Sequence, residues 1–581
     1  MTQHEYAAQV DARAQQLLEA CNERGNYRSL WGFHAAFACD ADPDLLTQIT
    51  SGHHEPGPFN IFPGIALLCR WEDRVPEAAV ADIKRMFLSG WQQRGNTENH
   101  WLMFYVGNLL AAERWADEPR FWNGLPPAAM HAEARRWILG MIARSATIGH
   151  YEYDSTGYHN EHFVPYLALA EHSRDEHLRQ QAEKMVLFLL ADMAVEYFHG
   201  AYAGGHSREG NVNTWTQVGP GQGLNYLYFG DEDFDPERHC QTYAVPAMAA
   251  HFRPPALLAR MALDRDTPHM VRKTKPPRAV YRHVERPAEA VRKTTWMSRS
   301  FALGSTQTGL PGPPAGPIDL VSWDLTWVGP RHQAKICCNH PYQSPKRFSA
   351  FLPDYPQRVG RSVGTGKPFL LRPDRLFGAS PYERMMQHEG TAIILYRIPE
   401  EDETPFVNCF LPKAPTWHER GDWLLADLGD FYVGVRPIGP YQWEDIREAG
   451  KDGNWIDGWL LRINDPHAGL VIEAVEQDDI ATFDEYLHRR SDSPPDLSGW
   501  PEAGRVAVST WAGTRLDMSF DGSHHIDGES IDYTAWPLLD SPCVAAPLGS
   551  GLVSLQHDDD SLSLDFGIDP DTEPLPMRVI G

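Results

Sequence analysis

The sequence predicts an α+β protein with two main parts, an all-α domain of helical hairpins followed by an antiparallel β-sandwich. The first half carries apolar residues at three- and four-residue spacing, in stretches rich in Ala, Leu, Met, Glu and Arg. The second half carries short alternating segments rich in Val, Ile and aromatic residues, separated by Gly, Pro, Asp and Asn. Because strands and helices do not alternate along the chain, a parallel βαβ sheet is excluded.

Six stretches of the first half are expected to form helices, and the short polar connections between them favour antiparallel hairpins. We place the all-α domain at residues 1–265. The expected helices are Glu5–Leu18, Thr97–Trp115, Ala128–Ile148, Tyr166–His172, Glu176–Phe198 and Tyr243–Leu263.

Residues 266–320 are expected to form a basic, Pro- and Gly-rich crossing between the two parts. Its cations are Arg272, Lys273, Lys275, Arg278, Arg282, Arg286, Arg292 and Lys293, and Leu303–Pro317 has the composition of a loop. The β-sandwich is expected at residues 321–581. Its clearest strands are Thr391–Ile398, Asp430–Ile438, Gly469–Glu476, Arg505–Trp511 and Leu562–Ile568.

Composition narrows the classes of function. The chain of 581 residues has 52 Lys and Arg against 78 Asp and Glu, a net charge of −26 that disfavours a general nucleic-acid binder. No uninterrupted apolar stretch is long enough to span a bilayer, so no membrane partner is expected. The first residues do not resemble a signal peptide, and the eight scattered cysteines do not form a disulfide pattern. We therefore expect a cytoplasmic protein of unknown oligomeric state.

The first group of polar residues is Asn96-Thr-Glu-Asn-His-Trp101. Asn96 or Thr97 is a plausible N-cap, which places Glu98, Asn99 and His100 in the first helical turn. A helix N-terminus favours a bound carboxylate, Asn99 can donate through its amide, and His100 can exchange a proton. Ordinary polar first-turn residues would explain the same pattern.

The second group is Tyr151-Glu-Tyr-Asp-Ser-Thr-Gly-Tyr-His-Asn-Glu-His162. Gly157 ends a helical stretch and Pro165 suits the first turn of the next helix, so Tyr158 and His159 are expected at a helix entrance. If the helices form a ring, Tyr158 and His159 could face Asn99 and His100. His159 and His162 have a spacing compatible with metal binding, but the local sequence offers no clear acidic third ligand.

The third group is Gly200-Ala-Tyr-Ala-Gly-Gly-His-Ser-Arg-Glu-Gly-Asn211. Its glycines would allow the backbone to approach a ligand closely, and Arg208 would neutralise an anion. An exposed glycine-rich turn is equally compatible with this composition. In the β half, His332, Cys337, Cys338 and His340 match no standard zinc spacing, and buried cysteines explain them better.

Together, and in this order, the three groups resemble the heparinase II/III and alginate lyase group of polysaccharide lyases. The resemblance is carried by Glu98-Asn-His, by Glu152-Tyr-x-Ser-x-x-Tyr158, and by the glycine-rich His206-x-Arg208 loop. It implies an N-terminal (α/α) toroid, an antiparallel β-sandwich, and β-elimination on a uronate-containing saccharide such as alginate or glucuronan. No metal or other cofactor is implied.

The resemblance also implies roles for individual residues. Asn99, assisted by Arg208, would neutralise the uronate carboxylate and stabilise the enolate-like intermediate. His100 is the expected base, or would instead share the neutralisation of the carboxylate with Asn99. Tyr158 would protonate the leaving oxygen or act as both acid and base. The residues expected to bind the acidic poly- or oligosaccharide are Glu98, Trp101, His159, His162, His206 and Asn211.

Two other classes of function are compatible with the same residues. A glycoside hydrolase on an α-toroid would use a pair of carboxylates, for which Glu98, Glu152, Asp154 and Glu161 are available. A carbohydrate-binding protein without activity would need none of the proton-transfer residues.

Overall fold

The computed structural model of the chain divides into two compact units. The first comprises Met1–Ala201, Val218–Leu263 and Gly549–Arg578, and the second comprises Tyr202–Gln217, Asp264–Leu548 and Val579–Gly581. The structure describes residues 1–25, 29–40, 54–95, 97–150, 152, 154–207, 220–276, 290–307, 320–329, 334–342, 372–376, 378, 380–450 and 453–568.

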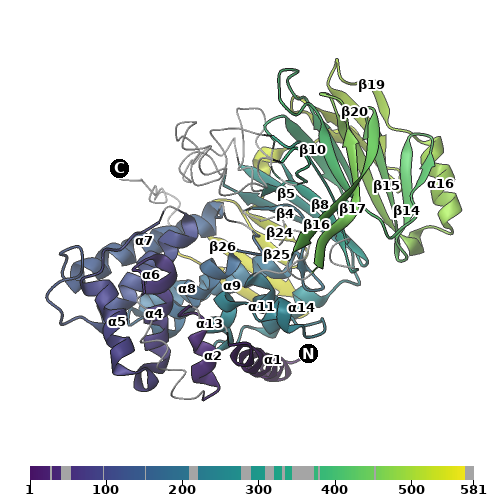
Figure 1. Ribbon diagram of the computed structural model, residues 1–581. Coiled ribbons are helices and arrows are strands. Elements are labelled where there is room, and N and C mark those ends of the chain that lie inside the picture. The colour runs from purple at the N-terminus through teal and green to yellow at the C-terminus, as the bar shows by residue number, and fades with distance from the viewer. Residues whose placement is uncertain are drawn as a thin grey trace. The chain divides into compact units, whose positions relative to one another are not determined.

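The first unit is built mainly of helices, and α6 lies at its centre. Helix α6 is buried along nearly its whole length and packs against α4, α7 and α8 (Figure 1). Gly107 of α6 allows the close approach of α4, because a Cβ atom there would lie 3.3 Å from the Cα atom of Phe62. The helices are α1 (Gln3–Glu23), α2 (Phe33–Ala38), α4 (Pro58–Trp71), α5 (Glu77–Leu88), α6 (Glu98–Arg114), α7 (Pro127–Ile148), α8 (His159–His172), α9 (Glu176–Ala194), α11 (Pro220–Tyr228), α12 (Pro236–His239), α13 (Val245–Met248) and α14 (Ala256–Leu263).

Most of the expected helices are confirmed, but the last one is wrong. The stretch 243–263 forms the short helix α13 and the separate helix α14, because Pro254 and Pro255 lie between them and neither can donate a backbone hydrogen bond. Helix α4 was not expected from its sequence. It begins with Pro58 at its first turn and contains Pro63 in its interior, and prolines at these positions conceal a helical pattern.

A β-hairpin near the end of the chain belongs to the helical unit. Its strands are β26 (Leu552–His557) and β27 (Asp560–Asp565), and they contact α14 and α9 respectively. The rings of Phe188 and Phe566 lie 6.3 Å apart, and Lys184 Nζ donates to the carbonyl oxygen of Asp565 at 2.7 Å. The sequence prediction had placed this hairpin in the β-sandwich, with residues 321–581.

The second unit contains two large antiparallel sheets. One has the strand order β16-β17-β12-β9-β8-β6-β5-β4-β24-β25, and the other has the order β10-β11-β18-β15-β14-β13. The strands of the first sheet are β4 (His269–Lys275), β5 (Val291–Met297), β6 (Phe301–Gln307), β8 (Trp323–Trp327), β9 (Lys335–Asn339), β12 (Val407–Pro412), β16 (Tyr441–Gly450), β17 (Gly453–Ile463), β24 (Leu539–Ser541) and β25 (Val544–Ala546). The strands of the second are β10 (Glu383–His388), β11 (Thr391–Tyr396), β13 (His418–Arg420), β14 (Trp423–Asp427), β15 (Phe431–Ile438) and β18 (Gly469–Glu476).

The two sheets pack face to face, which confirms the predicted sandwich. Alternate residues of one strand enter different cores, as the two-residue period of a strand requires. Ile394 of β11 lies in the core between the sheets, whereas Ile393 and Leu395 lie on the outer face of their sheet. Cys338 of β9 likewise lies in the central core, and Cys337 lies on the opposite face.

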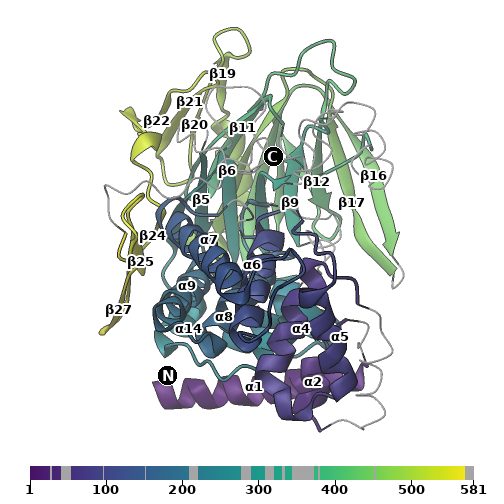
Figure 2. The ribbon, with the colours of Figure 1, turned by 90° about the vertical axis from the view of Figure 1, so that its left-hand side faces the viewer.

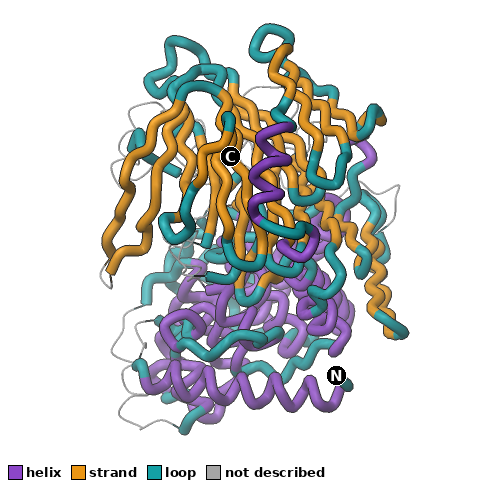
Figure 3. The backbone as a smooth tube through the Cα atoms, turned by 90° about the vertical axis from the view of Figure 1, so that its right-hand side faces the viewer, coloured by secondary structure: helices purple, strands orange, loops and turns teal. Residues whose placement is uncertain are grey.

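A third layer covers the outer face of the second sheet. It consists of helix α16 (Phe483–Asp492) and a small sheet of β19 (Asp496–Gly499), β20 (Arg505–Ser509), β21 (Arg515–Ser519), β22 (His524–Ile526) and β23 (Glu529–Ser530). Figure 2 shows this sheet separate from the two larger ones, and Figure 3 shows α16 lying over the strands. The layer shares a core with the sheet beneath it through residues such as Tyr486, Val506 and Leu516.

The expected basic crossing at 266–320 forms strands in its described parts, so the loop prediction is wrong there. Lys273 of β4 pairs in register with Lys293 of β5, and both side chains are buried. The Val, Thr and Trp residues among the cations favour strands, and the charge concealed this pattern. Leu303 lies in β6, whereas Arg278, Arg282 and Arg286 are outside the described residues.

Two further findings concern the whole described chain. None of its described helices combines the length and the apolar character that crossing a bilayer requires. All eight cysteines lie in the described part of the chain and are free thiols in the structure.

Candidate active site

The candidate site is built on the first turn of α6. Thr97 is the N-cap, as predicted: its Oγ1 accepts from the backbone N–H of His100 at 3.3 Å and donates to Asn99 Oδ1. The side chain of Asn99 is completely buried, and its amide donates to the carboxylate of Glu161. Because Glu161 lies in the first turn of α8, this hydrogen bond joins the first two sequence groups at one place.

Tyr158 occupies the entrance of α8. It is the N-cap residue of that helix, its backbone N–H donates to Ser155 Oγ at 3.0 Å, and its side chain is half-buried. His159 follows as the first helical residue and is buried. The position expected for Pro165 was wrong: it lies in the helix interior, and its missing N–H cannot bond to the carbonyl of Glu161.

Two buried carboxylates hold the two segments together. The backbone N–H of Asn99 donates to Glu152 Oε2 at 2.8 Å, and the backbone N–H of Glu152 donates to Glu98 Oε2 at 3.2 Å. Neither Glu98 nor Glu152 has any exposed surface. Each carboxylate therefore fixes the backbone of the segment opposite to its own.

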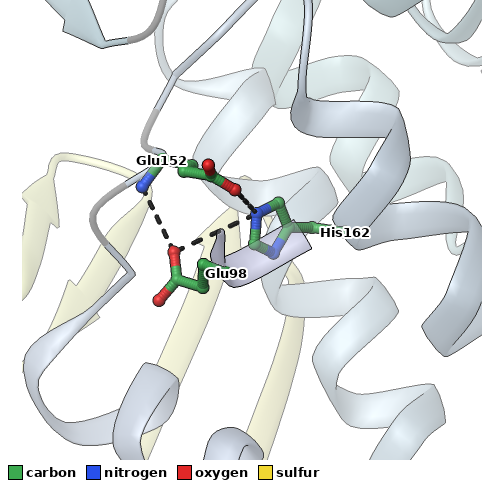
Figure 4. Close-up of side chains that lie close together, drawn as sticks. All are labelled: Glu98, Glu152 and His162. Atoms are coloured by element: carbon green, nitrogen blue, oxygen red, sulfur yellow. Dashed lines mark hydrogen bonds and ion pairs between the residues drawn. The ribbon is translucent and has the colours of Figure 1, made fainter. Parts of the chain in front are cut away.

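His162 lies against both carboxylates. Its Nε2 atom is 3.1 Å from Glu152 Oε2 and 4.0 Å from Glu98 Oε2. Figure 4 shows the carboxylate of Glu152 directed at the imidazole, and one oxygen of Glu98 linked to both the imidazole and the backbone N–H of Glu152. The ring of His150 packs 5.1 Å from that of His162. The sequence prediction had found no acidic partner for His162. The partners come from other segments, and no local spacing indicates them.

Burial determines the protonation of Glu98. The pKa of Glu98 is raised to about 7: burial is the largest cause and the charge of Glu152 acts in the same direction, whereas His162 and Arg144 oppose the shift. Arg144, near the end of α7, is itself buried. Glu98 and His162 are thus enclosed rather than exposed to a ligand, and they form the frame of the site.

His100 and Trp101 have different surroundings. His100 is half-buried, and its ring lies edge-on to Phe59 with centroids 5.2 Å apart. Trp101 is 3% exposed, donates from Nε1 to the carbonyl of Gly95 at 3.0 Å, and lies under the guanidinium of Arg94. Trp101 is therefore a packing residue and is not available to stack on a sugar, contrary to its expected role.

A tight turn supports His100. Gly95 has φ of +73°, and a Cβ atom at this position would lie 2.3 Å from His100 Nδ1. Only glycine fits both the backbone conformation and the space. The ring of Phe59, which packs on His100, also lies near the ring of Tyr243, with centroids 5.5 Å apart. The pKa of Tyr243 is raised, mainly by burial and to a lesser extent by the negative charge of Glu161. His150, Arg144 and Tyr243 had not been expected near the site.

The third group lies in the second unit. His206 is part of β3 (His206–Ser207), which pairs with β7 (Leu320–Val321). Its Nδ1 donates to the carbonyl of Gly204 at 2.8 Å, and burial lowers the pKa of His206 to about 4, so the imidazole is neutral at pH 7. Arg208 and Asn211 are outside the described residues.

The glycines before His206 are explained by packing. A Cβ atom at Gly205 would lie 1.8 Å from Thr306 Oγ1, and one at Gly204 would lie 2.8 Å from Thr295 Oγ1. Gly204 and Gly205 therefore allow their segment to pack closely against strands β5 and β6, whereas they had been expected to let a ligand approach.

The buried-cysteine interpretation of the β half agrees with the structure. Cys337 and Cys338 are buried in strand β9, and His340 Nδ1 hydrogen-bonds to Ser380 Oγ at 2.9 Å. His332 lies outside the described residues. Among the described residues, the cluster with metal-ligand geometry is that of Glu98, Glu152 and His162.

Comparison with known proteins gives general similarities only. No family model matches the chain, and no curated protein matches it. Among solved structures, the chain is similar to a chondroitin AC lyase from Streptomyces coelicolor A3 in complex with chondroitin sulphate, at 10% identity over 95% of this chain and 88% of that one, with a TM-score of 0.43. It is also similar to heparinase III, at 9% identity over 88% and 81% of the two chains, with a TM-score of 0.40.

A heparan sulfate lyase from Pedobacter heparinus is a more distant match, at 8% identity over 89% of this chain and 83% of that one, with a TM-score of 0.25. At such TM-scores, the assignment of function depends on the site residues themselves.

Proposed function

We propose that the protein is a polysaccharide lyase that cleaves a uronate-containing poly- or oligosaccharide by β-elimination. The observation that carries the proposal is the hydrogen bond from the Asn99 side chain to Glu161, in the first turn of α8. It brings together an amide donor and the helix entrance of Tyr158 and His159, which are the groups that the sequence resemblance assigns to the reaction.

The chemistry follows from the substrate. A base removes the proton from C5 of the uronate, the electron pair forms the C4–C5 double bond, and the C4–oxygen bond breaks as the leaving oxygen takes a proton. The C5 proton is weakly acidic beside an ionised carboxylate, so the site has to neutralise that carboxylate and stabilise an enolate-like intermediate. The side-chain amide of Asn99 would provide a donor by exchanging its buried hydrogen bond to Glu161 for one to the substrate, since the backbone N–H groups of Asn99 and His100 already donate to Glu152 and Thr97.

Two residues would transfer the protons. His100, half-buried against Phe59, would accept the C5 proton, and Tyr158 would protonate the leaving oxygen or perform both steps. The sequence resemblance also assigns carboxylate neutralisation to Arg208 and substrate contacts to His159, His206 and Asn211. An alginate- or glucuronan-like chain is the proposed substrate class.

Ultraviolet absorbance tests the proposal directly. The purified protein is incubated with alginate, glucuronan, hyaluronan and heparan-type substrates while absorbance and new reducing ends are both recorded. Elimination creates a double bond conjugated to the carboxylate, and hydrolysis does not. A rise in absorbance that is lost in Tyr158→Phe and His100→Ala supports the lyase, whereas new reducing ends without absorbance contradict it.

One observation favours a glycoside hydrolase as the second candidate. Glu98 and Glu152 lie together, and the raised pKa of Glu98, about 7, fits a general acid. Both carboxylates are fully buried, however, so this function requires a sugar to reach groups that have no exposed surface. In that case Glu98→Gln would abolish the release of reducing ends, and Tyr158→Phe would not.

A further inference from the structure

The cluster of Glu98, Glu152 and His162 has the geometry of a metal site. One ligand atom from each residue lies within 4.8 Å of the others, and all three residues are buried. The residues come from three separate places, namely the first turn of α6, the segment before α8, and the first turn of α8. Figure 4 shows the three side chains close together, with the carboxylate of Glu152 directed at the imidazole.

We propose that Glu98, Glu152 and His162 bind one divalent transition-metal ion of the Mn²⁺ to Zn²⁺ series. Two carboxylate oxygens and an imidazole nitrogen are suitable ligands for such an ion. The distance of 3.1 Å from His162 Nε2 to Glu152 Oε2 agrees with the separation of neighbouring ligand atoms around a metal whose bonds are about 2.1 Å long. Glu98 Oε2 lies 4.0 Å from the same nitrogen and would be the third ligand atom of the ion.

The ligand atoms are already oriented by their surroundings. The backbone N–H of Glu152 holds Glu98 Oε2 at 3.2 Å, and that of Asn99 holds Glu152 Oε2 at 2.8 Å. Outer hydrogen bonds of this kind fix the direction of metal ligands. Binding would replace the hydrogen bond between His162 and Glu152: the neutral imidazole carries its single proton on Nδ1, and the lone pair of Nε2 binds the ion.

The local charge also favours a cation. Two ionised carboxylates without exposed surface are costly to bury unless positive charge compensates them. Arg144 provides one positive charge near Glu98. With a divalent ion and a neutral His162, the charges of Glu98, Glu152 and Arg144 sum to +1, and the buried carboxylate of Glu161, which is bonded to Asn99, brings the total to zero. The ion would therefore neutralise this buried group, and its binding does not depend on the proposed function.

The test measures metal binding by the full-length protein. Protein freed of metal with a chelator is titrated with ZnCl₂ and with MnCl₂ by calorimetry, and bound metal is counted by mass spectrometry. We expect one ion per chain in the wild type. In Glu98→Gln, Glu152→Gln and His162→Gln the affinity should fall by more than ~10-fold, since even the loss of an outer hydrogen bond weakens metal sites by that factor.

A matched control separates ligand loss from the loss of a buried pair. Glu113 is a buried carboxylate of the same unit and lies 3.2 Å from the ring of His131, but outside the cluster. Glu113→Gln should bind the ion with wild-type affinity. Circular dichroism of each variant establishes that it is folded.

Two results would overturn the inference. One is a wild type that binds neither ion; the other is a folded cluster variant that binds as tightly as the wild type, because the chain has 26 histidines that could bind zinc elsewhere. If the variants do not fold, a crystal of the wild type soaked in Zn²⁺ decides: anomalous scattering at Glu98, Glu152 and His162 supports the site, and a peak only elsewhere contradicts it. None of these readouts requires activity on a saccharide, so the two proposals fail separately.

Discussion

Glu152 accepts a hydrogen bond at 2.8 Å from the backbone N–H of Asn99, a residue 53 positions earlier in the chain. The carboxylate thus caps the positive end of helix α6, where it satisfies an N–H group that has no partner within the helix. The same carboxylate lies against His162 of α8. One side chain therefore sets the relative positions of the two helix entrances that carry Asn99 and Tyr158.

Replacing Tyr158 by phenylalanine should abolish elimination and leave the fold unchanged. The hydroxyl would be lost while the ring and the N-terminal position in α8 are kept. Because general acid or base catalysis contributes about 10²- to 10⁴-fold, we expect kcat to fall by at least ~100-fold. Absorbance assays on the active substrate and a thermal melt of the same sample measure both effects. A variant that retains most of the wild-type rate would remove Tyr158 from the mechanism.

Asn99 and Glu161 should be energetically coupled. Asn99→Asp would place two carboxylates against each other in a buried position, which we expect to lower the free energy of unfolding by about 1–3 kcal/mol or more. Adding Glu161→Gln to Asn99→Asp should restore part of the lost free energy of unfolding, because the new glutamine amide can donate a hydrogen bond to the aspartate at position 99. Urea unfolding of the wild type, the two single variants and the double variant provides the cycle. Additive effects would show that the pair does not interact.

Gly95→Ala should lower stability by more than the cost of placing alanine at a positive φ, and it should also reduce activity. Its Cβ atom would lie 2.3 Å from His100 Nδ1, so the imidazole would have to move. Gly124 is a matched control, since it also has a positive φ, of +82°, and has open space around the Cβ position. Gly124→Ala should cost about 1–2 kcal/mol of stability, and Gly95→Ala should cost more and reduce activity. Equal losses in the two variants would mean that His100 adapts without cost.

Glu383 should make the second unit less stable as the pH rises. Burial raises the pKa of Glu383 from an ordinary value of 4.5 to about 8, so the folded state holds a proton that the unfolded state releases. Between these two values the unfolded chain binds fewer protons, and the free energy of unfolding falls with pH. Glu383→Gln removes this dependence.

The stability of Glu383→Gln relative to wild type should therefore increase between pH 5 and pH 8, by at least about 1.4 kcal/mol, which corresponds to one unit of pKa difference. Chemical denaturation at the two pH values measures it. A difference between the two proteins that stays constant with pH would contradict the assignment.

Local interactions explain what could be predicted from the sequence. The capping of α6 by Thr97 depends on residues within one helical turn, and the strand at Thr391–Tyr396 is a continuous run of β-branched and apolar residues that are all buried. Both features can be recognised in a short window. In β4 and β5 the strand pattern was concealed, because lysines and arginines at buried positions look like an exposed segment.

The frame of the site could not be predicted in this way. Glu98, Glu152 and His162 are brought together by the packing of α6 against α8, and no spacing in the chain identifies them as neighbours. The burial of Trp101 likewise depends on Arg94 and on the turn at Gly95. Residue types predicted which side chains could take part in chemistry, whereas tertiary packing determined which of them are accessible.

The hairpin β26–β27 gives the chain an unusual order of assembly. Strands β4 to β25 are synthesised between α14 and this hairpin, although the hairpin contacts α14 and α9. During translation the helices emerge early, but the surface formed by Phe188 has to wait for Phe566. A fragment that ends at Leu548 would leave that surface uncovered, and so would one that ends at residue 265. Expression of the helical part alone should therefore begin from a circularly permuted chain that joins residues 549–568 to the helices.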